Sequence, residues 1–148
     1  MSSQIVDVAE AVKTSLNAGT FSQTFTAMRK WVPKVALAAL DTIAVTVVPK
    51  DYARENETRG ETRRTIQIDI GIQKRFNYLE TNPEDPTKLD ELDELMQLVE
   101  EIANYFTPGG YGGARWVRTE IPEPMFDIQV LDKESTFTSV VTVTLTRV

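Results

Sequence analysis

Residues 65–73 read Thr-Ile-Gln-Ile-Asp-Ile-Gly-Ile-Gln, and this stretch decides the fold. Its isoleucines alternate with mostly polar residues, the period of two that is typical of a strand with one buried face. With Lys74, Arg75 and Phe76 included, the run is about twice the usual strand length of five or six residues. The sequence therefore predicts one long strand whose isoleucines line the core.

Other stretches have the composition of strands. Residues 43–48 are β-branched almost throughout and end at Pro49. Alternation of apolar and polar residues extends from Phe137 to Thr146, and a weaker alternation extends from Phe21 to Val32. Residues 35–40 are ambiguous between a helical turn and a strand. The remaining expected strands are 115–121, with Val117, Thr119 and Ile121 opposite Trp116 and Arg118, and a short edge piece over 125–130.

Two amphipathic segments predict helices. The first follows Ser2 or Ser3 as a cap and ends before Gly19, where a left-handed helix stop is expected. The second has Asp85 as its cap and Pro86 at its first helical position, and extends to Phe106. The expected buried side chains are Ile5, Val8, Ala9, Val12 and Leu16 in the first helix, and Leu89, Leu92, Met96, Val99, Ala103 and Phe106, widened by Leu95, Leu98 and Ile102, in the second.

The order of these elements is α-β-β-β-α-β-β, which predicts the fold class α+β. Strands joined by hairpins indicate a mainly antiparallel sheet of four to five strands, with two helices packed on one face. The 148 residues fit one domain, and we find no internal repeat or second domain. Trp31 and Trp116 are expected to pack in the core or at its edge.

Composition excludes several classes of function. The chain has no cysteine and no histidine, so disulfides, thiolate nucleophiles and zinc–cysteine sites are excluded. Without histidine, the chain also lacks the residue that most often serves as a general base and as a ligand of transition metals. We therefore expect no enzymatic activity, no cofactor and no metal.

The charge and the hydropathy pattern bear on partners and location. The net charge of −6 argues against sequence-independent binding to nucleic acid. The sequence contains no run of about 18 apolar residues, so no membrane span is predicted. The start, Met1-Ser2-Ser3-Gln4, lacks the features of a secretory signal, so synthesis in the cytoplasm is the default expectation.

Residues 51–64 differ in kind from the rest of the chain. Acidic and basic residues are mixed, no aliphatic residue other than Ala53 anchors the segment, and Gly60 supplies flexibility. We expect a long loop or hairpin that projects from the body as a charged arm. It is either a mobile solvated loop or an arm that becomes ordered against a neighbouring copy, whose acidic helix offers carboxylates to arginines. The candidate interface residues are Tyr52, Arg54, Glu55, Glu57, Arg59, Glu61, Arg63 and Arg64.

Two other features invite a functional interpretation. The run Gly109 to Gly113 lacks the Gly-Lys-Ser/Thr ending of a phosphate loop and follows a helix, so an ordinary loop is favoured. Tyr111 in its middle is a candidate contact residue, since loop aromatics often anchor interfaces. The acidic helix pairs Asp90 and Glu91 with Glu94, but these side chains belong to the polar face, so a solvated surface is favoured over acid–base catalysis.

Four stretches carry a resemblance to a known family. They are residues 27–33 after the first helix, residues 45–49 with the charged arm, residues 68–74 followed by 93–96 and 100–102, and residues 137–145. On these stretches, which span most of the chain, the sequence resembles the tail terminator or tail-completion (neck) proteins of long-tailed bacteriophages.

The resemblance implies a structural virion protein that forms a ring, commonly of six copies, at the head-proximal end of the tail. Such a ring caps the tail tube in the neck of the virion, after assembly in the host cytoplasm. Its implied partners are further copies of itself, the tail tube protein and a head-side connector or stopper protein. DNA would pass through the lumen without specific binding, and no membrane would be involved.

Three alternatives remain open from the sequence. The protein could be another head–tail connector, such as a stopper or an adaptor. It could also be a small peptide- or ligand-binding α+β module that uses an open sheet edge. A carboxylate-dependent enzyme ranks last, because no acidic residue has an identified catalytic partner.

Overall fold

The computed structural model describes residues 3–31, 43–58, 61–75, 86–122 and 136–147. Expectations for residues 35–40, for the turn before Pro86 and for residues 125–130 fall outside these ranges. The elements of the fold are α1 (Gln4–Ala18), β1 (Ala27–Arg29), β2 (Ala44–Thr58), β3 (Glu61–Arg75), α2 (Pro86–Tyr105), β4 (Gly110–Tyr111), β5 (Ala114–Glu120) and β6 (Thr136–Arg147).

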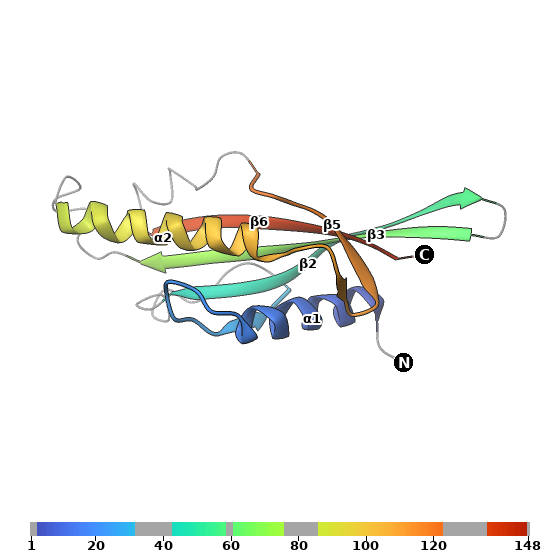
Figure 1. The fold of residues 1–148 in the computed structure, drawn as a ribbon, viewed down its shortest axis with the longest axis horizontal. Coiled ribbons are helices and arrows are strands. Elements are labelled where there is room, and N and C mark those ends of the chain that lie inside the picture. The colour runs from blue at the N-terminus through green and yellow to red at the C-terminus, as the bar shows by residue number, and fades with distance from the viewer. Residues whose placement is uncertain (1–2, 32–42, 59–60, 76–85, 123–135, 148) are drawn as a thin grey trace.

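The described strands form one six-stranded sheet in the order β1-β2-β3-β6-β5-β4 (Figure 1). Every neighbouring pair is antiparallel except β1 and β2, which are parallel. The predicted α+β class and the mainly antiparallel sheet are confirmed. The predicted strand count and order were wrong by one strand, because β4 is a two-residue strand that forms only by pairing Gly110 and Tyr111 with Arg115 and Ala114.

The core lies on one face of this sheet, as the isoleucine pattern predicted. Ile66, Ile68, Ile70 and Ile72 of β3 are fully buried. Their partners on β2 and β6 continue the same face, with Ile70 opposite both Val47 and Val141. Buried residues of α1 and of α2 belong to this same hydrophobic cluster, so both helices pack on that face.

The strand expected from Phe21 to Val32 is much shorter than predicted. Only Ala27–Arg29 pairs with β2. The side-chain amide of Asn17 occupies both backbone groups of Ala27, accepting from its N–H at 2.8 Å and donating to its carbonyl at 3.2 Å. Phe21 instead packs against Phe25 and against the ring of Tyr105, with centroids 5.2 and 5.0 Å apart. The alternation of aromatic residues thus reflects loop packing against α2.

The end of α1 also differs from its predicted form. Gly19 follows the helix, but its φ of −80° is not left-handed. A Cβ atom at this position would lie 2.7 Å from the ring of Tyr105 and 2.8 Å from that of Phe21. Glycine is therefore required for close approach of two aromatic rings. At the other end Ser3 occupies the cap position without making a side-chain capping bond.

The alternation predicted for β5, with Thr119 on the face opposite Trp116, was wrong: both residues lie on one face, where they pair with Val143 and Leu145 of β6. The register to β6 shifts between Trp116 and Arg118, so Val117 lies in a bulge and is 41% exposed. A bulge places two residues of one strand opposite one residue of its partner, which breaks the simple alternation. Trp116 is half-buried against the core, as expected, and its indole N–H donates to Thr119 Oγ1 at 2.8 Å.

Helix α2 begins at Pro86 as predicted, and its buried side is turned slightly from the predicted one. Leu92, Met96 and Ala103 are only partly buried. The most buried side chains of α2 and the residue after it are Leu95, Leu98, Val99, Ile102 and Phe106.

Among the described part of the chain, no helix is long and apolar enough to cross a membrane.

Candidate protein-interaction site

The charged arm is the outer part of the β2–β3 hairpin. Strand pairing continues outward to Thr58 opposite Glu61, with a shift of register after Asn56, whereas β6 pairs with β3 only from Arg64 onward. Beyond that point no further strand of the described residues pairs with the hairpin, and Figure 1 shows it extending past the rest of the molecule. The sequence left open whether the arm is a loop or a hairpin. The structure has a hairpin, because β2 and β3 keep pairing beyond a shift of register between Pro49 and Asp51.

Tyr52 lies at the base of this hairpin and connects it to α1. Its side chain is 37% exposed, and its hydroxyl donates to Gln4 Oε1 at 3.1 Å. The other candidate residues whose backbone is described lie farther out, Arg54, Glu55 and Glu57 on β2 and Glu61, Arg63 and Arg64 on β3. The side chains of the three glutamates, and Arg59 as a whole, lie outside the described structure.

Three arginines lie side by side at the hairpin base, and we call them the arginine row. Arg64 of β3 is directly opposite Arg54 of β2 on one side and directly opposite Arg147 of β6 on the other. Arg54 is exposed, and the other two are half-buried. Directly opposed like charges on neighbouring strands are destabilising. No described ion pair joins any of the three to a carboxylate, so the repulsion is not neutralised among the described side chains.

Sequence reasoning selected Arg54 and Arg64 but missed Arg147. It is far away in sequence and is brought into the row only by the pairing of β6 with β3. Its guanidinium lies over the β4–β5 turn, where a Cβ on Gly113 would be 3.4 Å from Nη1. The signal that could have found it is its place at the end of the alternating final segment, two residues beyond Leu145 on the same face.

A groove of about 450 Å³ lies between α2 and the segment that follows α1. We call it the acidic groove because it contains two carboxylates, those of Glu100 and Glu101. Glu100 is exposed and no described side chain pairs with it. Neutral polar groups and two aromatic rings complete the walls. The lining residues are Thr20, Phe21, Gln97, Glu100, Glu101, Asn104 and Tyr105.

Glu101 holds the groove in shape. It accepts hydrogen bonds from the backbone N–H of Ser22 at 2.9 Å and from its hydroxyl at 2.8 Å. These bonds lower the pKa of the Glu101 carboxyl below 4.5, the backbone bond first, because they stabilise the charged form. Tyr105 supports the other end, since its hydroxyl donates to the carbonyl of Ser15 at 2.7 Å.

Replacing Glu101 with glutamine is expected to lower stability by about 0.5–1 kcal/mol near neutral pH, because solvent screens much of a partly exposed bond. The folded-state pKa is depressed, so this contribution is present above pH 4.5 and is lost as pH falls through the folded-state value. Urea unfolding of both proteins at about pH 7 and about pH 3 measures it. A difference that is the same at both pH values would contradict the role of the Glu101 charge.

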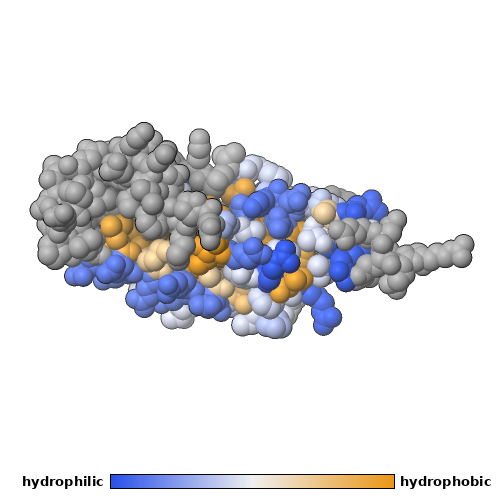
Figure 2. Space-filling model, turned by 90° about the horizontal axis from the view of Figure 1, so that it is seen from above, coloured by the Kyte–Doolittle hydropathy of each residue, from blue (hydrophilic) through white to orange (hydrophobic). Residues whose placement is uncertain are grey.

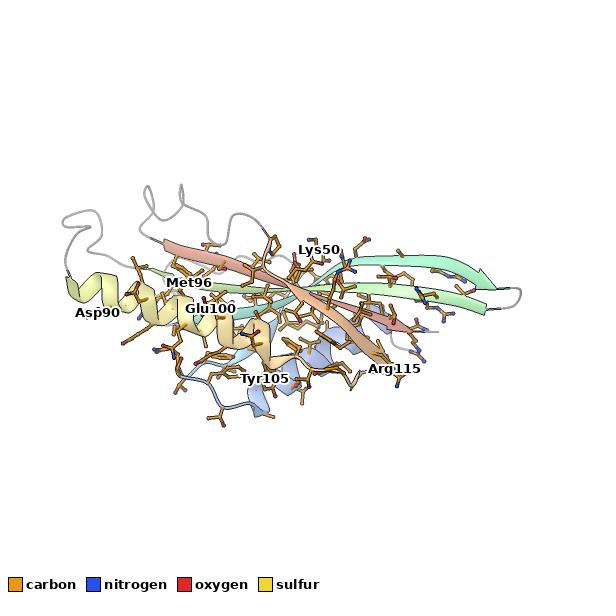
Figure 3. All side chains as sticks on the ribbon, turned by 45° about the horizontal axis from the view of Figure 1, so that its top comes forward. Lys50, Asp90, Met96, Glu100, Tyr105 and Arg115 are labelled. Carbon is orange, nitrogen blue, oxygen red and sulfur yellow. The ribbon has the colours of Figure 1, made fainter. Side chains whose placement is uncertain are left out.

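Charge is unevenly distributed along the molecule. Figure 3 shows Asp90, Glu100 and Tyr105 along α2, and Arg115 on β5 beyond the end of that helix. Hydrophilic residues form a band along one long edge of the face shown in Figure 2, with hydrophobic residues next to it. The acids of α2 are Asp90, Glu91, Asp93, Glu94, Glu100 and Glu101, against one lysine, Lys88.

The remaining candidates have local explanations. Tyr111 is half-buried, with its ring 5.7 Å from that of Phe106, and its turn contains Gly112 and Gly113 at positive φ, typical of a tight hairpin. Of the paired carboxylates, Asp90 and Glu94 are exposed, and Glu94 accepts a bond from Gln23 Nε2 at 3.3 Å. Among the described residues, no three acidic side chains gather into a metal-binding group.

Trp31 is exposed, contrary to its predicted place in the core or at its edge. It was expected to pack, yet it is 64% exposed beside β1, and Met28 is 50% exposed. Arg29 lies over the indole ring at 5.3 Å and donates to Glu10 Oε1 at 2.6 Å. Because β1 is an edge strand of only three residues, the core ends before it reaches this tryptophan.

Comparison of the sequence with protein-family models finds no match, and comparison with curated proteins finds none either.

Proposed function

We propose that this protein is a structural subunit of a bacteriophage tail that assembles into a ring at the head-proximal end. The ring, hexameric as the resemblance implies, would cap the tail tube and join it to the head connector. DNA would pass through its lumen, and the partners would be other copies, the tube protein and a connector or stopper. The single observation that carries the proposal is the projecting β2–β3 hairpin.

The physics of a two-stranded hairpin supports this role. A hairpin without a third strand or a packed face is at best marginally stable in water. Here β2 and β3 pair for several residues beyond the end of β6. A strand pair with mixed charges gains stability when another chain covers it, and its charges set register and orientation. An assembly subunit has a use for such an element that a self-contained domain lacks.

Removing the outer hairpin is expected to abolish ring assembly and leave folding nearly intact. Arg54 and Arg64 are directly opposite, so an Asn-Gly turn can join them in place of residues 55–63. The deleted part lies outside the hydrophobic core, so the thermal midpoint should remain near that of the full chain. Sedimentation velocity, with and without purified tail tubes, measures assembly.

Gly109→Ala is the control for this deletion, because a Cβ there would meet nothing closer than 3.8 Å; this variant should assemble normally. Normal rings formed by the deletion variant would show that the hairpin is not needed. A full-length chain that stays monomeric at every concentration, and also with tail tubes, would contradict the proposed function itself.

One observation favours the peptide-binding alternative. Met28 of β1 and Trp31, which follows this strand, are exposed, and β1 is an edge of the described sheet. Extended peptides can add to such edges, with side-chain pockets giving specificity. A strictly monomeric protein that binds peptides, and loses this binding in Trp31→Ala, would favour that function over ring assembly.

A further inference from the structure

The arginine row lacks a partner of opposite charge among the described side chains of its own chain. Neighbouring strands are about 4.8 Å apart, so Arg54, Arg64 and Arg147 place three guanidinium-bearing chains next to one another. Arginine is suited to planar, bidentate pairing with carboxylates. An acidic partner would therefore turn an unfavourable row into a favourable contact.

The acidic groove has the complementary chemistry. Glu100 offers a carboxylate with no described partner, and Glu101 offers a second one, held in place by the backbone N–H and the hydroxyl of Ser22. Tyr105 lines the same groove, so a guanidinium entering it meets an aromatic ring as well as a carboxylate. Arginine stacks on such rings, which a lysine does less well.

The row and the groove of one copy cannot meet. The length of α1 gives the distance between the two sites. Its first residue, Gln4, contacts Tyr52 near the row, and Ser15 contacts Tyr105 in the groove. At 1.5 Å per residue, eleven residues of helix span about 16 Å. This is longer than an extended arginine side chain, so a contact between the row and the groove would join two chains.

We propose that the arginine row of one copy binds the acidic groove of a second copy, with Arg54 directed to Glu100. The two surfaces differ, so the contact is head-to-tail and can repeat around a closed ring. This inference rests on the proposed ring function and specifies the partner surfaces within it.

The test is a charge exchange in the full-length chain, with self-association measured by sedimentation velocity over a range of concentrations. Arg54→Glu and Glu100→Arg should each weaken association by about tenfold or more, because each places like charges in contact. The double variant should recover most of the loss, because the pair is restored with its polarity reversed. Added salt should weaken association of the natural chain.

Asp93→Arg is the matched control. Asp93 is an exposed acid on α2 that does not line the groove, so the same charge reversal there should leave association nearly unchanged. Thermal midpoints of all variants, read by circular dichroism, show that the exposed substitutions leave folding intact.

Several outcomes would overturn the pairing. If Glu100→Arg associates normally while Arg54→Glu does not, the acidic groove is excluded as the partner of the row. The proposed ring function would then still stand. Failure of the double variant to recover would exclude a direct contact. Binding of short duplex DNA that Arg54→Glu removes, without any loss of self-association, would assign the row to phosphates instead. A natural chain that never self-associates would remove the ring function as well.

Discussion

Replacing Ile70 with alanine is expected to lower the free energy of unfolding by about 3–4 kcal/mol, a large part of the stability of one domain. Ile70 is fully buried near the middle of β3 and is opposite Val47 and Val141, so strands on both sides prevent the site from collapsing. The loss combines two quantities: the burial free energy of the removed hydrocarbon groups and the cost of the cavity that they leave. Urea unfolding followed by circular dichroism measures it.

The matched control is Ile70→Val, which removes one methylene group. Its expected loss is about 0.5–1.5 kcal/mol, because the branched shape at Cβ is retained. Equal small losses for both variants would show that the isoleucine face is not closely packed. A large loss for the valine variant would instead indicate a rigid requirement for shape.

Gly112→Ala is expected to destabilise the fold by about 2–5 kcal/mol through two effects that add. Gly112 has a φ of +58°, where a side chain is strained. A Cβ there would also lie 2.8 Å from the carbonyl oxygen of Asp7 and 3.0 Å from Cα of Val8. Both are backbone atoms of α1, so the helix itself would have to move away from the β4–β5 turn. Thermal and urea unfolding measure the loss.

Two neighbouring glycines separate the two effects. Gly113 also has a positive φ, of 88°, but a Cβ there meets the flexible end of Arg147 at 3.4 Å. Gly113→Ala should therefore show mainly the backbone strain, about 1–2 kcal/mol. Gly109→Ala, where a Cβ would make only an ordinary contact at 3.8 Å, should be nearly neutral. Equal effects at Gly112 and Gly113 would mean that α1 does not pack against the turn.

Much of the candidate interface could be selected from the sequence, but its geometry could not. The mixed charges of residues 51–64 identified an arm, because a stretch with so little apolar surface has no place in a core. The choice between loop and hairpin depended on how far β2 and β3 stay in register, which is a property of two strands together. Arg147 joined the site only through the pairing of β6 with β3.

The acidic groove shows the same limit. The acids of α2 were assigned to a solvated face, and periodicity alone supports nothing more. The groove exists because Ser22 binds Glu101 and Phe21 packs on Tyr105, contacts between residues about 80 apart in the chain. Alternating aromatics in residues 21–32 therefore predicted a strand, when their period came from packing against a helix.

By itself the sequence determined the isoleucine face of β3, the alternation of β6, the start of α2 at Pro86 and the α+β class. These follow from local periodicity and from the backbone limits of proline, which act wherever the chain lies. The tertiary structure alone decided the strand β4, the bulge at Val117, the exposure of Trp31 and the arginine row. Each of these depends on which distant segment lies alongside, and a single strand or loop carries no local signal for that.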